Sequence, residues 1–215
     1  MKHALRWLIA LLFALPVLAD DLFDHPQTPA RAQAVLRAAM PDLGQIQVLR
    51  GRFEQRKYLS EIPQPLTSSG EFLLVRDLGV WWHAQTPIDS AVTLTHGGLV
   101  QLDAGPSAPD RTSLRQPGSE LVASVFFALF TLDIDTLARS FDLFMTDSGG
   151  RWQLGLRPRD ASLAAWFQQA IISGGARVEQ VRLYEAAGDR TEIDLDATAQ
   201  PRSSLTPTER QRFEP

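Results

Sequence analysis

The chain of 215 residues contains no cysteine. In an exported protein, where disulfides can form, this absence means that stability must come from an apolar core and not from covalent cross-links. It also excludes a lipid-modified N-terminal cysteine. We therefore expect a soluble protein that is not itself a lipoprotein.

Motifs for catalysis and for metal binding are also missing. The four histidines include no pair at the spacing of metal ligands, and neither Gly-x-Ser-x-Gly nor a phosphate-binding glycine loop occurs. His96 precedes Gly97-Gly98 and is typical of a turn, and His25 lies in a polar lead. The sequence therefore predicts no enzyme, no cofactor and no metal site, although catalytic residues scattered along the chain would escape a search for motifs.

The first residues have the pattern of a secretory signal. A short basic start ends at Arg6, an apolar run covers 7–15, and Val17-Leu18-Ala19 ends in the small residue that a signal peptidase needs. The apolar run is too short to span a bilayer, and Pro16 follows it, which argues against an uncleaved anchor. We expect a secretory signal peptide at 1–19 that is cleaved after Ala19.

Charge and length limit what the remaining residues can be. Removal of Lys2 and Arg6 leaves 19 basic residues of the 21, against 25 acidic residues, so the mature net charge is 19 − 25, or −6. This acidic balance argues against binding to nucleic acid. Residues 20–215 are enough for one domain with a sizeable core, and we find no internal repeat or long linker.

The pattern after the signal begins with a helix and continues with short strands. Thr28 is a candidate N-cap followed by Pro29, and Ala30 to Met40 favours a helix that Pro41 ends. Turn residues separate the predicted strands that follow, at 46–59, 70–76, 79–85, 88–95 and 99–103. With no helix between them, these strands are expected to pair as an antiparallel meander.

The second half is expected to mix helices and strands. A polar segment at 103–118 precedes an apolar helix at 121–130, a short helix at 135–140 and a tail from 201 that we expect to be loosely held. Further strands are expected at 141–146, 152–157, 178–185 and 191–197, and a third helix at 162–172. The fold class is therefore α+β.

Two predicted strands show a clear division of faces. With a period of two, Leu49, Gly51 and Phe53 share one side of the first strand. In the second strand, the same spacing puts Arg76 on the face of Phe72 and Leu74. A buried guanidinium at this position needs carbonyls or carboxylates as partners. Alternatively, the side chain of Arg76 reaches solvent at the edge of the sheet, and the sequence alone leaves both readings open.

The apolar helix at 121–130 is hydrophobic on nearly every side. Leu121, Val125, Leu129 and Leu132 form one stripe, and Val122, Phe126 and Phe130 form an adjoining one. A helix of this kind is either buried all round or lies over a cavity.

Together these segments resemble the periplasmic outer-membrane lipoprotein carrier family, the LolA-like proteins of Gram-negative bacteria. The resemblance rests on Gly51-x-Phe53-x-Gln55-x-Lys57, on Gly70-x-Phe72-x-x-x-Arg76 and on the spacing of Trp82 and Pro87, and it continues weakly to Gly188-Asp189-Arg190-Thr191-x-Ile193. It implies an open, incomplete antiparallel β-barrel wrapped around a helical lid, with an apolar cavity for acyl chains.

The resemblance also implies roles for individual residues. The acyl chains would meet a concave sheet face and the lid, which are expected to contribute Phe53, Phe72, Leu74, Trp82, Leu121, Val125, Phe126 and Leu129, although each of these could equally be an ordinary core residue. Arg76 would bind carbonyls of the lid and act as a latch. Family members commonly have proline after that arginine, whereas this chain has Asp77, which could pair with Arg76 and leaves the cargo in doubt.

The function implied is carriage of lipoproteins from the inner to the outer membrane. The implied partners are lipidated cargo, an inner-membrane export complex and an outer-membrane acceptor, with the carrier itself a monomer. Two alternatives stay open: a related carrier of a non-lipoprotein lipid, glycolipid or polyene-type product, and a lipid-sensing regulatory domain of the same fold. A sensor would need an additional partner-binding domain, for which we expect this chain to be too short.

Overall fold

The computed structural model describes residues 22–95, 98–102, 111–113, 128, 131–199 and 205–213. Its first helix, α1 (Pro29–Ala39), begins as the sequence predicts, because the Thr28 side chain accepts a hydrogen bond from the Arg31 backbone and proline occupies the first turn. A short 3₁₀ turn, η1 (Leu43–Gln45), then leads to the sheet.

The first half of the sheet is the predicted meander of five strands, followed by a sixth strand that the sequence did not predict, within the polar segment at 103–118. Its described strands are β1 (Val48–Tyr58), β2 (Leu66–Val75), β3 (Gly79–Thr86), β4 (Ser90–Thr95), β5 (Gly98–Leu102) and β6 (Arg111–Ser113). Each pairs antiparallel with the next, and Gly51 faces Phe72 in the β1–β2 register.

The second half adds two helices and five strands within the described residues. They are α3 (Ile134–Ser140), β7 (Phe141–Ser148), β8 (Arg151–Pro158), α4 (Ala161–Ala164), β9 (Phe167–Gly174), β10 (Val178–Glu185) and β11 (Arg190–Ala199). A tight turn joins β7 to β8, and Gly149 and Gly150 take the positive φ values that favour glycine there.

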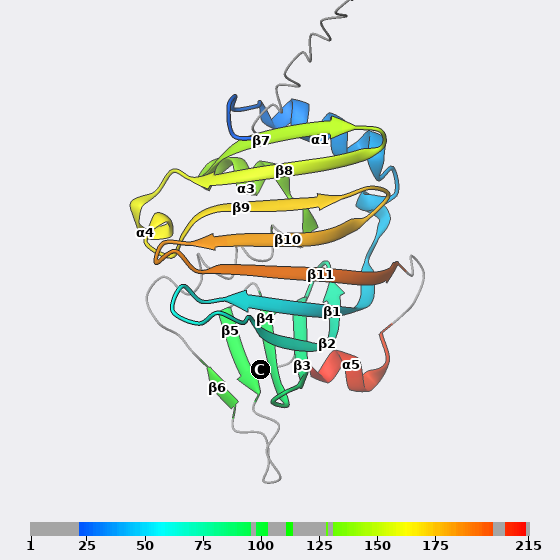
Figure 1. The fold of residues 1–215 in the computed structure, drawn as a ribbon. Helices are drawn as coiled ribbons and strands as arrows, with labels where there is room; N and C mark the ends of the chain where they lie inside the picture. The colour runs from blue at the N-terminus through cyan, green and yellow to red at the C-terminus, as the bar shows by residue number, and fades with distance from the viewer. Residues whose placement is uncertain are drawn as a thin grey trace, which may run out of the picture.

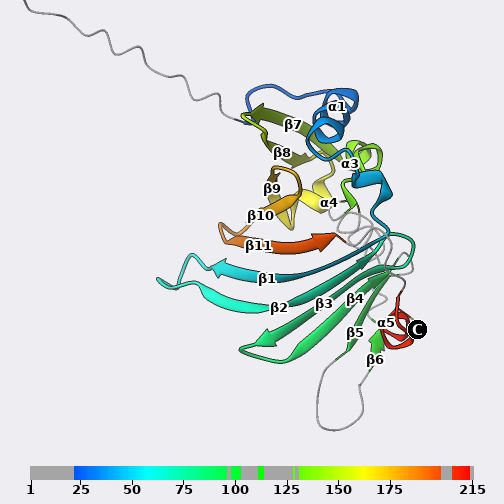
Figure 2. The same ribbon diagram turned by 90° about the vertical axis from the view of Figure 1, so that its right-hand side faces the viewer.

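All described strands form one sheet in the order β6-β5-β4-β3-β2-β1-β11-β10-β9-β8-β7. The two halves meet where β1 pairs antiparallel with β11. Strands β6 and β7 lie at the two ends of the order, and among the described residues β6 pairs with β5 and β7 pairs with β8, not with each other. The sheet is strongly curved and remains open (Figures 1 and 2). The predicted α+β fold with an open antiparallel β-barrel is confirmed.

Helices cover the two ends of the sheet on different faces. On the inner face, α1 and α3 pack against β7 to β9 around fully buried residues such as Leu36, Leu137 and Leu154. On the outer face, a C-terminal helix, α5 (Pro207–Gln211), lies near β3 to β6, and its flanking residue Phe213 packs with a cluster that includes Leu73 and Trp81 (Figure 2). Alternation along β2 thus buries odd-numbered residues under α5 and leaves even-numbered residues for the concave side.

Two sequence predictions were wrong. The expected helix at 162–172 is only the short α4, and Phe167–Gly174 is the strand β9, which pairs with both β8 and β10. The expected loose tail contains α5, which a capping box between Thr206 and Glu209 begins. Glu209 also forms an ion pair with Arg50 on β1, at 2.8 Å, and this pair holds the helix on the sheet.

Several predictions concern residues outside the described part of the chain. They include the signal peptide at 1–19 and the apolar helix at 121–130, of which only residue 128 is described. Among the described helices, none has both the length and the hydropathy that a membrane span requires.

Candidate functional site

A cavity of about 710 Å³ lies on the concave side of the sheet. Its volume is within the range of about 300–1,000 Å³ that is usual for pockets of small organic ligands. Strands β1, β2, β10 and β11 form one wall, and the end of α1 with the turn after it forms the other. The lining is mainly apolar: Ala39, Met40, Pro41, Leu43, Ile46, Leu49, Phe72, Leu74, Ala176, Val178, Val181, Leu183, Ile193 and Leu195.

Side chains alternate between the two faces of each strand, and this alternation places the lining residues of β10 and β11 on the cavity side, with one β-bulge in β10. Ile193 and Leu195 on β11 face the same side, as do Val181 and Leu183 on β10. The pairing of β10 with β9 shifts between Val178 and Gln180, which indicates a β-bulge. Because of this extra residue, Val178 lines the cavity together with Val181, three positions on.

Of the residues predicted from sequence, Phe72, Leu74 and Arg76 line this cavity. Phe53 and Trp82 form an aromatic stack beside it, with ring centroids 3.8 Å apart, and Trp82 also stacks on Phe72 at 5.9 Å. Phe53 and Phe72 are buried together with Ile193. In this structure, Phe53 and Trp82 therefore support the wall of the cavity, and Phe72 presents an apolar ring to it.

The predicted lid residues Leu121, Val125, Phe126 and Leu129 lie outside the described residues. Their contribution to the cavity stays a prediction. The neighbouring Thr131 is described, is buried, and lines the cavity.

The expected partners of Arg76 were carbonyls of the lid at 121–130, whereas within the described residues its side chain binds carbonyls of the segment between α1 and β1. Its Nε donates to the carbonyl oxygen of Ile46 at 3.0 Å, and its Nη2 donates to that of Leu43 at 2.8 Å. Its backbone N–H also donates to the carbonyl of Gln47, at 3.0 Å. One residue at the end of β2 thus holds three carbonyls of the segment that joins α1 to β1, and neither side-chain bond goes to Asp77.

Sequence reasoning missed this segment, which we call the 40–47 strap. Met40, Pro41, Asp42, Leu43 and Ile46 all line the cavity, although the strap contains only a short 3₁₀ turn without a buried residue. Its sequence, with proline and glycine around a few apolar residues, indicated only the end of a helix. The carbonyls that Arg76 binds are 30 and 33 residues away in the chain, so no local pattern could identify them.

Polar groups gather where the strap approaches the β9–β10 turn. Asp42, Arg177 and Glu179 join Arg76 in the lining, and Glu179 also accepts a hydrogen bond from Arg151 at 2.6 Å. Two acidic and two basic side chains in the lining balance in charge. Within the described ranges, no cluster of three or more possible metal ligands occurs. The site therefore has an apolar interior and a polar end whose charged side chains sum to zero. Such a site suits an amphiphile better than an ion.

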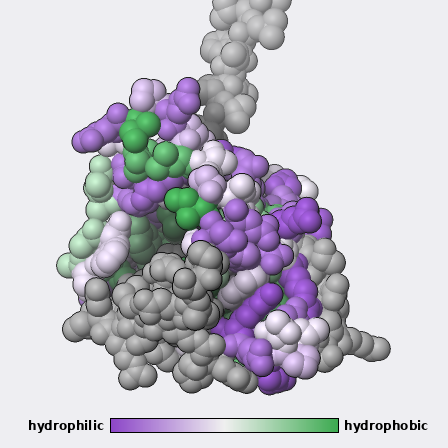
Figure 3. All heavy atoms as spheres, turned by 90° about the horizontal axis from the view of Figure 1, so that it is seen from below, coloured by the Kyte–Doolittle hydropathy of each residue, from purple (hydrophilic) through white to green (hydrophobic). Residues whose placement is uncertain are grey.

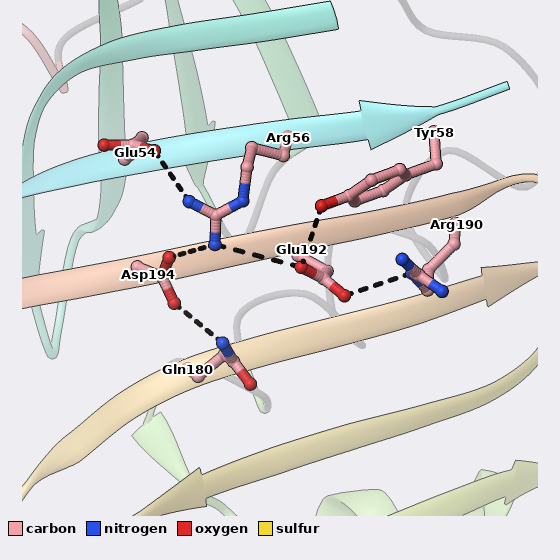
Figure 4. Close-up of polar contacts among 7 residues, drawn as sticks. All are labelled: Glu54, Arg56, Tyr58, Gln180, Arg190, Glu192 and Asp194. Atoms are coloured by element: carbon pink, nitrogen blue, oxygen red, sulfur yellow. Dashed lines mark hydrogen bonds and ion pairs between the residues drawn. The ribbon is translucent and has the colours of Figure 1, made fainter. Parts of the chain in front are cut away.

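The outer face of β1, β11 and β10 has a different character, with an extended polar network (Figure 4). Arg56 contacts the carboxylates of Glu54 and Asp194, and its pKa is raised chiefly by the hydrogen bond to Asp194. Burial alone would raise the pKa of Asp194, but hydrogen bonds from Gln180 and Arg56 outweigh it and lower the pKa. Each charged group of the network has a partner of opposite charge, so this face is a solvated sheet surface and not a second site.

The comparison with protein families decides the classification. Residues 44–206 match the family model described as outer membrane lipoprotein carrier protein LolA. The chain belongs to the LolA family. The match covers residues 44–47 of the strap, both predicted motif strands and the second half of the sheet, so the resemblance seen in the sequence is confirmed.

Several solved structures are distantly similar to this chain. A LolA superfamily protein from Nitrosomonas europaea is 13% identical over 86% of this chain and 97% of its own, with a TM-score of 0.44. The complex of MucA and MucB from Pseudomonas aeruginosa matches with 15% identity over 80% of this chain and 59% of that chain, with a TM-score of 0.42. No curated protein sequence matches significantly. Both TM-scores lie below 0.5, so assignment to the LolA family rests on the family model.

Proposed function

We propose that this LolA-family protein is a periplasmic carrier. After loss of the signal at 1–19, residues 20–215 would act as a single monomeric domain without enzymatic activity. The protein would shield the acyl chains of lipoproteins in its cavity and move them from an inner-membrane export complex to an outer-membrane acceptor. The observation that carries this proposal is the cavity of about 710 Å³ with aliphatic and aromatic residues on its walls.

The free energy of burying an acyl chain explains why such a cavity is needed. At about 0.8 kcal/mol per buried methylene, a chain of about sixteen carbons gains on the order of 10 kcal/mol by leaving water. An unshielded chain would therefore not cross the periplasm. The cavity-lining residues Leu49, Leu74 and Leu195 offer an acyl chain the apolar contact that it otherwise has in the membrane.

Release requires that this contact can be weakened, and Arg76 is the residue that we propose as the latch. Its bonds to Leu43 and Ile46 hold the strap against the end of β2. Since the strap supplies one wall of the cavity, loosening these bonds would widen the cavity and let a chain enter or leave. The predicted lid at 121–130 would share in this movement.

Native mass spectrometry tests the proposal and identifies the cargo. The protein is purified from the periplasm of its own host without detergent, and the mass of whatever remains bound is measured. A bound lipoprotein supports the carrier role in full, and a bound free lipid or glycolipid supports the related carrier that Asp77 suggests. Protein that is empty both in this preparation and after incubation with lipidated cargo would contradict both.

A further inference from the structure

The large apolar side chains that are exposed in the described part of the chain are few. They are Ile62, Leu66, Ile88 and Trp166, with exposed fractions of 44%, 54%, 73% and 69%. Single exposed apolar residues are common and need no explanation. The position of these four in the fold is what carries an inference.

All four lie at the same end of the sheet. Ile62 and Leu66 belong to the β1–β2 hairpin, Ile88 to the β3–β4 hairpin, and Trp166 immediately precedes β9. The strand registers align these positions, because Lys57 pairs with Leu66, Tyr58 with Arg190, and Glu185 with Phe167. In Figure 1 the β1–β2 and β10–β11 turns and α4 lie on the left, and the β3–β4 hairpin lies at the bottom; in Figure 3 the left and upper left of the surface show green hydrophobic residues interspersed with purple ones.

Hydrogen bonds join three of the connections at this end, and the β3–β4 hairpin has a contact of its own. The backbone N–H of Ser60 donates to Asp189 Oδ1 at 3.0 Å, which joins the β1–β2 loop to the β10–β11 loop. The backbone N–H of Ala186 donates to the carbonyl of Trp166 at 3.2 Å. On β3, His83 Nε2 lies 2.8 Å from Asp89 Oδ1, beside Ile88. The exposed side chains are therefore presented by a preorganised surface, which we call the hairpin rim.

The connections of the hairpin rim carry a net negative charge, because the basic residues at the adjoining strand ends are paired, Lys57 with Glu185 and Arg190 with Glu192. The connections 59–65, 87–89 and 186–189 each contain one acidic residue, Glu61, Asp89 and Asp189, and no lysine or arginine. The connection before β9 contains Arg159 and Asp160, which cancel, and Arg159 bonds to Asp142 at 2.7 Å. An anionic bilayer and a second copy of the same acidic rim would both be repelled.

We propose that the hairpin rim is a docking surface for a protein with an apolar recess surrounded by basic residues. The apolar side chains would enter the recess, and the three acidic residues would meet the basic border and guide the approach. The strap and Arg76 lie at the opposite end of β1 and β2, so a partner held at the rim leaves the latch uncovered. The inference does not depend on what the cavity holds.

Site-specific photo-cross-linking in the host periplasm tests the inference. A photoreactive residue replaces Ile88 or Trp166 in the full-length protein, and the exposed position Gln45, in the strap, serves as the control site. We expect positions 88 and 166 to cross-link the same protein, whose contact region carries excess lysine and arginine, and position 45 not to do so. The variant Glu61→Lys should lower the yield at least about fivefold.

The matched control is Asp24→Lys, which reverses an exposed charge away from the rim and should leave the yield unchanged. Glu61 is exposed, so its reversal should leave thermal unfolding intact, and unfolding curves of both variants check this. Four results would overturn the proposal: cross-links to lipid, cross-links to a second copy of the chain, cross-links that do not respond to Glu61→Lys, and no cross-link specific to the rim. Cargo binding, measured separately by native mass spectrometry, distinguishes such a failure from failure of the carrier role.

Discussion

Replacing Arg76 by leucine should release the strap without unfolding the sheet. The substitution removes two hydrogen bonds, from Nε to Ile46 and from Nη2 to Leu43, at 3.0 and 2.8 Å. Bonds from a charged donor contribute roughly 1.5–3 kcal/mol each, but the freed carbonyls lie on an exposed turn and can bind water instead. We therefore expect a combined loss below the sum of two full bonds, about 2 kcal/mol in the free energy that opposes local opening.

Hydrogen exchange measures this local opening directly. Because about 1.4 kcal/mol corresponds to a factor of ten, a loss of about 2 kcal/mol should speed exchange at strap amides roughly 30-fold. The informative amides are Gln45, which donates to Asp42 at 2.9 Å, and Arg76, which donates to Gln47. The backbone N–H of residue 76 persists in the variant and reports whether the strap still lies on β2.

The functional consequence should follow the structural one. Arg76→Leu is expected to change the retention of lipidated cargo and its transfer to acceptor membranes, either by trapping the cargo or by leaving the cavity open. Arg139→Met, which removes an exposed arginine on α3, is the matched control and should change neither exchange nor transfer. Unchanged exchange in the strap of Arg76→Leu, together with unchanged retention and transfer, would refute the role of Arg76 as a latch.

Three further predictions concern the cavity, the sheet and the C-terminal helix. Leu195→Trp should place an indole in the cavity and lower lipid binding at least about tenfold in a fluorescent fatty-acid titration, with the fold retained. Gly51→Ala should cost about 1–3 kcal/mol in chemical denaturation, because the added Cβ would lie 2.5 Å from the carbonyl oxygen of Asp196. Glu209→Gln should destabilise the protein above pH 4.5 and progressively less below it, since Arg50 lowers the pKa of Glu209 from 4.5 to about 2.

Each of these predictions has a control and a result that contradicts it. Gln85→Trp adds the same indole on an exposed strand end and should bind lipid normally, so equal binding by both tryptophan variants would argue against the cavity. Gly44→Ala has nothing within 4 Å of its added Cβ and should be nearly neutral. The ionised Glu209 carboxylate contributes fully to the free energy of unfolding above its pKa in the unfolded chain. This contribution is lost as the pH falls through its lower pKa in the folded protein. A stability difference that stays constant from pH 6 to pH 3 would contradict the Arg50 pairing.

The sequence predicted the sheet better than it predicted the helices. Alternation placed Phe72, Leu74 and Arg76 on one face because the concave side of β2 is apolar and its period is two. The segment 162–172 carried Leu163, Phe167 and Ala170 at a spacing that also fits a helix. Pairing of β9 with two neighbouring strands decided its conformation, and such pairing is a tertiary effect that no local pattern reveals.

The candidate site was only partly visible in the sequence. The position of Arg76 on an apolar face left carbonyls, carboxylates and solvent open as its partners. The choice of the strap carbonyls depends on how α1 packs over the sheet. The helix α5 carried a readable signal, Thr206-Pro207 with Glu209 at the third helical position, and the proline-containing composition of the tail obscured it. Which side chains line the cavity and which support it, as Phe53 and Trp82 do, depends on packing across four strands.

Photolabelling from the acyl chain is the most direct test of the central claim. A lipopeptide with a diazirine near the end of its acyl chain is bound to the protein and irradiated, and the modified residues are mapped by mass spectrometry. The account predicts adducts on cavity residues such as Leu49, Leu74 and Leu195, which disappear in Leu195→Trp. Adducts confined to exposed residues such as Trp166, at the same level in both proteins, would contradict it.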